Sequence, residues 1–90
     1  MDFEWDPRKA AKNVRKHRVS FEEAATVFAD PRALTFADPD HSDREDRFLT
    51  FGRSNARRPV IVSHVDRDQT TRIISARKMT PSERHIYETG

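Results

Sequence analysis

The sequence contains no cysteine and only two glycines among its 90 residues. Without cysteine the chain has no disulfide framework and no thiolate metal site. Two glycines are too few for a glycine-rich phosphate loop, and no serine stands in the nucleophile turn of a serine hydrolase. No apolar run is long enough to cross a bilayer, and residues 1–5 do not resemble the start of a signal peptide. We therefore expect a soluble, cytoplasmic protein that uses no metal and no cofactor.

Acidic and basic residues are separated along the chain. Residues 38–46 contain five acidic residues and one arginine, whereas residues 47–90 contain nine basic and four acidic residues. Lys78 is the only lysine of this second half, and arginine suits planar, bidentate phosphate contacts better than lysine does. The basic half predicts a polyanionic partner such as nucleic acid, although solvated surface charge would produce the same count.

Three helices are predicted from capping signals and apolar spacing. An Asp-Pro pair precedes the first helix, and S/T-x-x-E capping boxes precede the other two. The expected ranges are 7–16, 21–29 and 81–88. Strands are predicted over residues 3–5, 34–37, 47–53, 60–65 and 71–78, where β-branched and aromatic residues alternate with polar ones. Short turns between the last three strands indicate an antiparallel meander. We expect one α+β domain over residues 1–90, with two N-terminal helices packed on the sheet and a third helix at the C-terminus.

The simplest hairpin register divides the side chains of the last three strands between two faces. One face would carry Arg47, Leu49, Phe51, Val60, Val62, His64, Ile73, Ser75 and Arg77. The other would carry Phe48, Thr50, Ile61, Ser63, Val65, Arg72, Ile74, Ala76 and Lys78. Both sets include apolar residues, and a slip of one residue would exchange them, so the pattern does not identify the helix-covered face.

Three blocks of the sequence resemble the BrnT family of toxins. They are Phe3-x-Trp5-Asp6-x-x-Lys9, then Asn13-x-x-Lys16-His17-x-Val19-Ser20-Phe21-x-x-Ala24, and then Arg72-x-Ile74-Ser75-Ala76-Arg77-Lys78 with Glu83-Arg84 and Tyr87 downstream. The segment Asp38-Pro39-Asp40-His41-Ser42, with Glu45-x-Arg47, fits as well. The order and spacing are kept over nearly the whole chain.

This resemblance implies a RelE-like fold and the toxin half of a type II toxin–antitoxin pair. The implied activity is an endoribonuclease that cleaves RNA without metal and inhibits translation. The implied partner is a small DNA-binding antitoxin of the BrnA type, which neutralises the toxin and with it represses their operon by binding operator DNA. The alternative is a basic module without enzymatic activity that binds nucleic acid or a transcriptional regulator.

Metal-independent RNA cleavage needs a base near the 2′-hydroxyl, cations around the phosphate and an acid or cation at the leaving oxygen. Three residues are the candidate catalytic groups: Arg77 as the phosphate clamp, Lys78 beside it, and His64 for proton transfer. Four further residues are candidates for RNA binding, and these are Arg72, Arg47, Tyr87 and His41.

Each candidate also has a purely structural interpretation. Arg77 could pair with Glu83 or with the first helix, His64 could be a buried hydrogen-bonded histidine, and Tyr87 could pack the last helix on the sheet. In the simplest register His64 and Arg77 are about 20 Å apart, too far to touch one phosphate. His17 fits a role in the core or at the helix end better than one in catalysis.

Two further features of the sequence bear on these expectations. The alternating acids of residues 38–45 lack the glycine and spacing of a calcium loop, so a role in solubility or partner binding is favoured over a metal site. At position 18 the family usually has glycine, which suits a left-handed helix end, and this chain has Arg18. Either the turn differs locally or Arg18 bears about 1 kcal/mol of strain.

Overall fold

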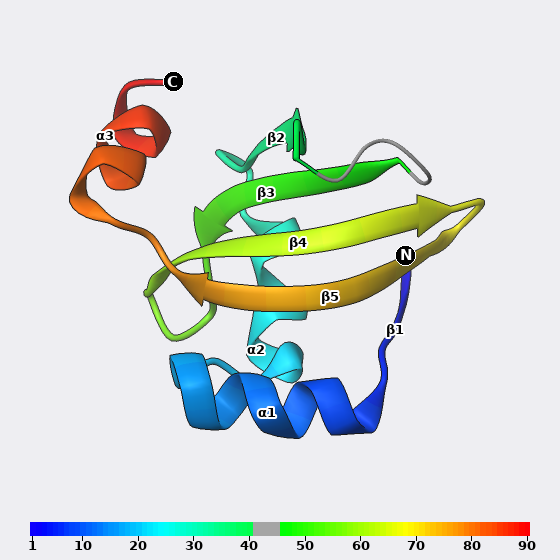
Figure 1. Ribbon diagram of the computed structural model, residues 1–90. Coiled ribbons are helices and arrows are strands. Elements are labelled where there is room, and N and C mark those ends of the chain that lie inside the picture. Colours follow the sequence, from blue (N-terminus) through cyan, green and yellow to red (C-terminus); the bar gives the residue numbers. More distant parts are fainter. Residues whose placement is uncertain (41–45) are drawn as a thin grey trace.

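The computed structural model describes residues 1–40 and 46–90. Its strands are β1 (Asp2–Glu4), β2 (Leu34–Ala37), β3 (Arg47–Arg53), β4 (Pro59–Arg67) and β5 (Thr70–Lys78). Its helices are α1 (Pro7–His17), α2 (Phe21–Thr26) and α3 (Pro81–Thr89), and a 3₁₀ turn, η1 (Val27–Ala29), follows α2 directly. The strands form one sheet in the order β1-β5-β4-β3-β2, so the first and last strands are neighbours (Figure 1). The α+β class predicted from the sequence is confirmed.

The sheet is mixed: the antiparallel meander expected for the last three strands is present, and β1 adds a parallel strand at its edge, so the sheet as a whole is not an antiparallel one. Strands β2 to β5 pair antiparallel, whereas β1 runs parallel to β5, with Asp2 opposite Thr70 and Glu4 opposite Arg72. A short turn fixes the direction only of the two strands that it joins. Because β1 leads into a helix instead of a hairpin, its direction is decided by where α1 and α2 return the chain. Trp5 lies outside the strand and packs edge-on against Phe21, with ring centroids 5.9 Å apart.

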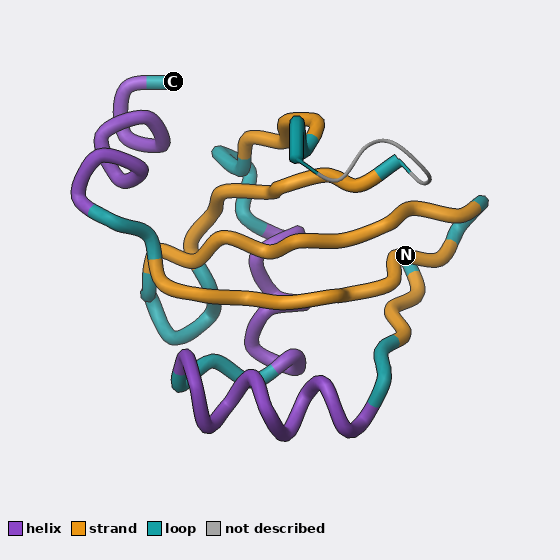
Figure 2. Tube along the Cα trace, in the orientation of Figure 1, coloured by secondary structure: helices purple, strands orange, loops and turns teal. Residues whose placement is uncertain are grey.

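Helix α2 lies on one side of the sheet, α1 lies along its β5 edge, and together they enclose the main core. Figures 1 and 2 show α2 crossing behind the strands and α1 running beside β5. The buried residues of this core are Val19, Phe21, Ala24, Val27, Val60, Val62, Ile73 and Ala76. Val60 and Val62 alternate along β4, so this face of the sheet is fixed by apolar burial against the helices.

The opposite face, here called the open face, is covered at one end by α3. Tyr87 of α3 packs with Phe51 of β3, Ile61 of β4 and Met79 in a second buried cluster. The capping box predicted for α3 is present, since the Thr80 hydroxyl accepts from the backbone of Glu83 and the Glu83 carboxylate accepts from the backbone of Thr80. The rest of the open face has no helix over it in the described part of the chain.

An irregularity between β4 and β5 decides which side chains share the open face. The pairing passes from Ser63–Ser75 to His64–Ile73, so one extra residue is inserted into β5. A bulge of this kind shifts the alternation of side chains beyond it. Arg72 and Arg77 therefore lie on the same face of the sheet, although strict alternation would separate them.

The observed register corrects the simplest one in two places. Relative to the simplest register, β3 is shifted by one residue along β4. Phe48, and not Leu49, therefore lies on the same face as His64. The open face collects Arg47, Leu49, Phe51, Ile61, Ser63, Val65, Arg72, Ser75 and Arg77. The simplest register placed Arg72 on the face opposite to Arg47 and Arg77, and that expectation is wrong because of the bulge.

The end of α1 shows how Arg18 is accommodated. Arg18 has φ 60° and ψ 30°, which is the left-handed conformation, and its backbone N–H donates to the Val14 carbonyl at 2.9 Å. The turn therefore keeps the geometry that a glycine would adopt there, and the arginine bears the strain.

Candidate functional site

Cations occupy both ends of the open face. At one end, a row of paired residues crosses the sheet from Glu4 through Arg72 and Val65 to Arg47. At the other end Arg77 is opposite Ile61. The two rows are four residues apart on β4, or about 13 Å. Between them lie Ser63 and Ser75, paired and partly exposed. These cations and the hydroxyl row between them form the candidate site.

Arg77 is held by a carboxylate at the start of α3. Its Nη1 and Nη2 donate to the two oxygens of Glu83 at 2.7 and 2.8 Å. The hydrogen bonds from Arg77 lower the pKa of Glu83 to about 2, so the pair is fully ionised near neutral pH. The Arg77 side chain is nevertheless 42% exposed. The ion pair considered as its alternative role is present, and it orients the guanidinium on the open face without covering it.

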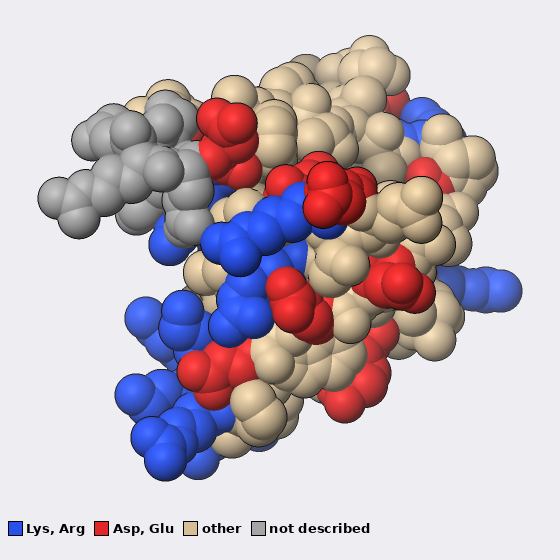
Figure 3. Space-filling view, turned by 90° about the vertical axis from the view of Figure 1, so that its right-hand side faces the viewer, with Lys and Arg blue, Asp and Glu red and all other residues tan. Residues whose placement is uncertain are grey.

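The other basic candidates lie near Arg77 or at the far end of the face. Lys78 is the exposed last residue of β5 and, by alternation, points to the helix side, where its charge helps to lower the pKa of Glu23. Arg72 is 36% exposed and its nearest contact with Glu4 is long, at 3.8 Å. Arg47 is partly exposed. In Figure 3, lysine and arginine side chains gather toward the left edge, which is the front of Figure 1, with acidic side chains among them.

His64 lies on the helix-covered face and is only 1% exposed. Its Nε2 is 2.7 Å from the Thr50 hydroxyl and its Nδ1 is 2.8 Å from Asp66 Oδ1. Burial lowers its pKa, and the hydrogen bond with Asp66 opposes that effect. Phe28 packs edge-on against the ring. A buried imidazole on the opposite face from Arg77 has no path to a shared phosphate, so the structure argues against a role for His64 in contacting RNA.

Of the two remaining candidates for RNA binding, Tyr87 is placed by the structure and His41 is not. Tyr87 is 6% exposed within the cluster under α3, and its hydroxyl donates to Asp30 Oδ2 at 2.6 Å. This is the packing role considered as its alternative, and it leaves no ring face for stacking on a base. His41 lies outside the described residues, so its predicted role stays a prediction.

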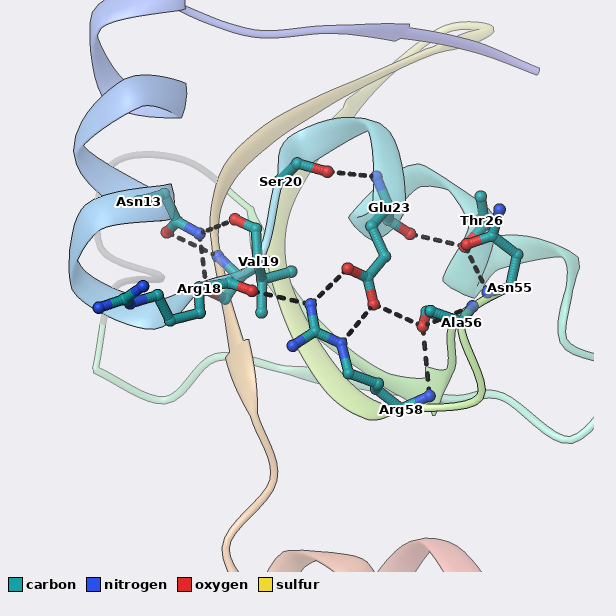
Figure 4. A network of polar contacts seen from close by, with 11 residues as sticks. Asn13, Arg18, Val19, Ser20, Glu23, Thr26, Asn55, Ala56 and Arg58 are labelled. Carbon is teal, nitrogen blue, oxygen red and sulfur yellow. Dashed lines mark hydrogen bonds and ion pairs between the residues drawn. The ribbon is translucent and has the colours of Figure 1, made fainter.

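A second feature of the site, which the sequence did not reveal, is the network that fixes the end of α1. Asn13 Nδ2 donates to the carbonyls of Val19 and Ala76 at 2.9 and 2.8 Å, and the Ala76 N–H donates back to Asn13 Oδ1. Arg58 donates to the Glu23 carboxylate and to the Arg18 carbonyl (Figure 4). These contacts hold the last turn of α1 against the end of β5. The only sequence signal was the position of Asn13 within a family block.

His17 belongs to this last turn of α1 and is partly exposed. Its pKa is lowered by partial burial and by the positive charges of Lys16 and Arg77. The bonds of Asn13 to Ala76 place this turn of α1 beside the end of β5 that carries Arg77. His17 and Arg77 are 60 positions apart in the sequence, and no pattern in the sequence singles out this pair. In the described part of the chain, no group of three or more histidine, cysteine or acidic side chains could hold a metal ion, and no helix could span a membrane.

A family model described as the ribonuclease toxin BrnT of a type II toxin–antitoxin system matches residues 5–83. Among solved structures, the chain is similar to the 1.1 Å crystal structure of the Brucella abortus ribonuclease toxin BrnT, with 23% identity and a TM-score of 0.68. That alignment covers 89% of this chain and 97% of the Brucella chain, and at this identity it establishes the fold. None of the curated proteins matches the chain.

Proposed function

Because the chain belongs to the BrnT family of ribonuclease toxins of type II toxin–antitoxin systems, we propose that it cleaves RNA on the open face of its sheet. The observation that carries the proposal is that Arg47, Arg72 and Arg77 share one face of the sheet, which Arg72 joins because of the bulge in β5. Two rows that carry arginine, about 13 Å apart along the strand backbone, suit a single-stranded RNA backbone, since phosphate contacts recur along such a chain.

The proposed reaction needs no metal ion. The RNA 2′-hydroxyl attacks its neighbouring phosphorus, the bond from phosphorus to the 5′-oxygen breaks, and a 2′,3′-cyclic phosphate is left. Arg77, oriented by Glu83, contacts the scissile phosphate and stabilises the charge that builds up in the transition state. Lys78, exposed at the end of β5 with its side chain toward the helix side, adds positive potential at that end of the strand, and Arg47 and Arg72 bind the flanking backbone. Such catalysis depends mainly on positioning and electrostatics.

We further propose that cleavage of cytoplasmic RNA inhibits translation and that an antitoxin of the BrnA type neutralises it. A type II toxin has a protein antitoxin as its partner. An antitoxin segment with acidic side chains that lies over the open face would compete with RNA for the same arginines. The complex would bind operator DNA through the antitoxin, because the toxin's cations would then be covered.

The second candidate function is a basic module that binds nucleic acid or a regulator without turnover. The ion pairing of Arg77 favours it, because a structural arginine would have the same partner. The two functions differ in whether products form.

A labelled single-stranded RNA incubated with the purified protein in EDTA distinguishes them. We expect cleavage, with a cyclic phosphate end on the 5′ product, and no cleavage where a 2′-deoxy nucleotide replaces the attacking one. Arg77→Ala should lower the rate at least 100-fold while circular dichroism remains unchanged. Arg84→Ala is the matched control, because Arg84 is exposed on α3 and pairs with Glu88. Binding of RNA without products would favour the second function.

A further inference from the structure

We propose that His17 is the general base of the RNA cleavage, taking the proton from the attacking 2′-hydroxyl beside Arg77. This inference rests on the proposed function and names a group that the sequence had assigned to a structural role. It follows from three observations: where the end of α1 is fixed, what surrounds the His17 ring, and which other described histidines can reach the open face.

The position of His17 is set by contacts on both sides of it in the sequence. Asn13, one helical turn earlier, is bonded to both backbone polar groups of Ala76, the residue before Arg77. Arg58 holds the carbonyl of Arg18, the residue after His17. Residues i and i+4 lie above one another on a helix, about 6 Å apart along its axis. Since Asn13 faces β5, His17 faces the same strand nearer to its end, where Arg77 and Lys78 lie.

The surroundings of the ring suit a proton acceptor. No described residue hydrogen-bonds the His17 imidazole, so a ring nitrogen is available to a substrate, and the ring is partly exposed. The charged groups around it are Lys16 on its own helix and Arg77 on β5, which is paired with Glu83 of α3. Partial burial and then the two cations lower the pKa of the imidazole, so it is neutral at physiological pH and can accept a proton.

The other described histidines do not meet these conditions. His64 is enclosed under the helices with both ring nitrogens engaged. His85 is exposed on α3 two positions after Glu83, so its side chain points away from the face of the helix that holds Arg77. Of the described histidines, His17 alone combines a free ring nitrogen with proximity to Arg77.

The chemical step balances without a further reactant except water. The 2′-hydroxyl proton passes to a ring nitrogen of His17 as the 2′-oxygen forms its bond to phosphorus. The bond from phosphorus to the 5′-oxygen breaks with its electron pair, and the departing oxygen takes a proton from water. Arg77 bears the growing negative charge of the phosphate, and the imidazolium formed returns its proton to solvent.

The test compares single-turnover cleavage by the wild type, His17→Gln and His85→Gln on one fluorescently labelled oligodeoxynucleotide that contains a single ribonucleotide. His17→Gln should lower the rate by about 10²- to 10⁴-fold, which is the usual contribution of a general base. Binding of the all-deoxy analogue should stay within about threefold of wild type. The acidic limb of the pH–rate profile should disappear in His17→Gln and persist in His85→Gln. A His17→Gln rate and pH profile equal to those of the wild type would overturn the inference and leave the nuclease function standing.

If His17→Gln fails to fold, a second measurement on the wild-type protein tests the proposal. The pKa of His17 is read by NMR in the wild-type protein bound to the all-deoxy analogue and compared with the apparent pKa of the acidic limb. Agreement supports the assignment, and a clear difference overturns it. If the wild-type protein binds RNA and yields no products, the proposed nuclease function itself is wrong. That result is distinct from one in which the wild type cleaves RNA and His17→Gln cleaves it equally well.

Discussion

The side-chain amide of Asn13 is bonded to both backbone polar groups of Ala76, 63 residues away along the chain. Strand β1 pairs with β5 over residues 70–72, and α1 lies beside the remainder of β5. The amide therefore takes the place of the next strand and satisfies a buried N–H and a buried carbonyl. It also ties the end of α1, with His17, to the strand that carries Arg77.

Substitution of Asn13 should be among the most damaging changes in the protein. Asn13→Ala leaves the Ala76 backbone and the Val19 carbonyl without their partner in a buried site, which we expect to cost about 2–4 kcal/mol. Urea unfolding followed by circular dichroism measures this difference, with the exposed Lys12→Ala on the same helix as control. A loss below about 0.5 kcal/mol would mean that water replaces the amide.

Glycine at position 18 should stabilise the protein. Arg18 is in the left-handed conformation, which glycine adopts without strain. Arg18→Gly should raise the free energy of unfolding by about 0.5–1 kcal/mol, because relief of strain exceeds the added freedom of the unfolded chain. Arg18→Ala, which removes the side chain and keeps the strain, is the control. Equal stabilities for the two variants would contradict the backbone explanation.

The ion pair of Glu23 and Arg58 should show measurable coupling. Glu23 also accepts from Ser54, and the two paired side chains are 14% and 31% exposed, so water screens them less than it would a surface pair. A double-mutant cycle with Glu23→Gln and Arg58→Met should give a coupling energy of about 1–2 kcal/mol. The same cycle on the exposed Arg84 and Glu88 pair should give less than about 0.5 kcal/mol. Similar values for both cycles would show that partial burial does not increase the coupling energy of the Glu23–Arg58 pair.

Stability should fall with acidification through His64. Its pKa in the folded protein is below the ordinary value of 6.5 because the ring is buried, so the unfolded chain binds a proton more readily. The contribution of His64 to the free energy of unfolding is therefore fully present above about pH 6.5. It decreases as the pH falls toward the pKa of His64 in the folded protein. His64→Gln should flatten that slope, as measured by urea titrations at a series of pH values. Because the pKa of His17 is also lowered, part of the slope just below about pH 6.5 should remain in His64→Gln and be lost in the double variant. At lower pH the paired carboxylate of Glu83 adds a slope of its own. An unchanged slope in His64→Gln would show that His64 is protonated in the folded state.

The hydroxyl of Tyr87 should stabilise the attachment of α3. It donates to Asp30, which also accepts from the backbone N–H groups of Arg32 and Arg53. Tyr87→Phe keeps the ring in its cluster and should cost about 1 kcal/mol. Cleavage should be unchanged, because the ring is enclosed. A large loss of RNA cleavage with stability intact would return Tyr87 to the RNA-binding surface.

The sequence by itself determined the local elements and the family. Helix starts were predictable because caps act within one turn of the chain: Asp6 accepts from Arg8, Ser20 accepts from Glu23, and Thr80 forms the box with Glu83. The hairpins joining β3 to β4 and β4 to β5 were predictable because short turns fix antiparallel pairing. The family blocks indicated a BrnT toxin, which the family match confirmed.

Only the tertiary structure decided which side chains meet. One inserted residue in β5 moved Arg72 to the face of Arg77, and sequence alternation carries no mark of such a bulge. Whether His64 was buried or exposed depended on which face the helices cover, and apolar residues on both faces left that open. The direction of β1 and the approach of His17 to Arg77 depend on contacts about 60 or more positions apart. Such contacts are set by packing free energy over the whole domain and not by any local preference of the chain.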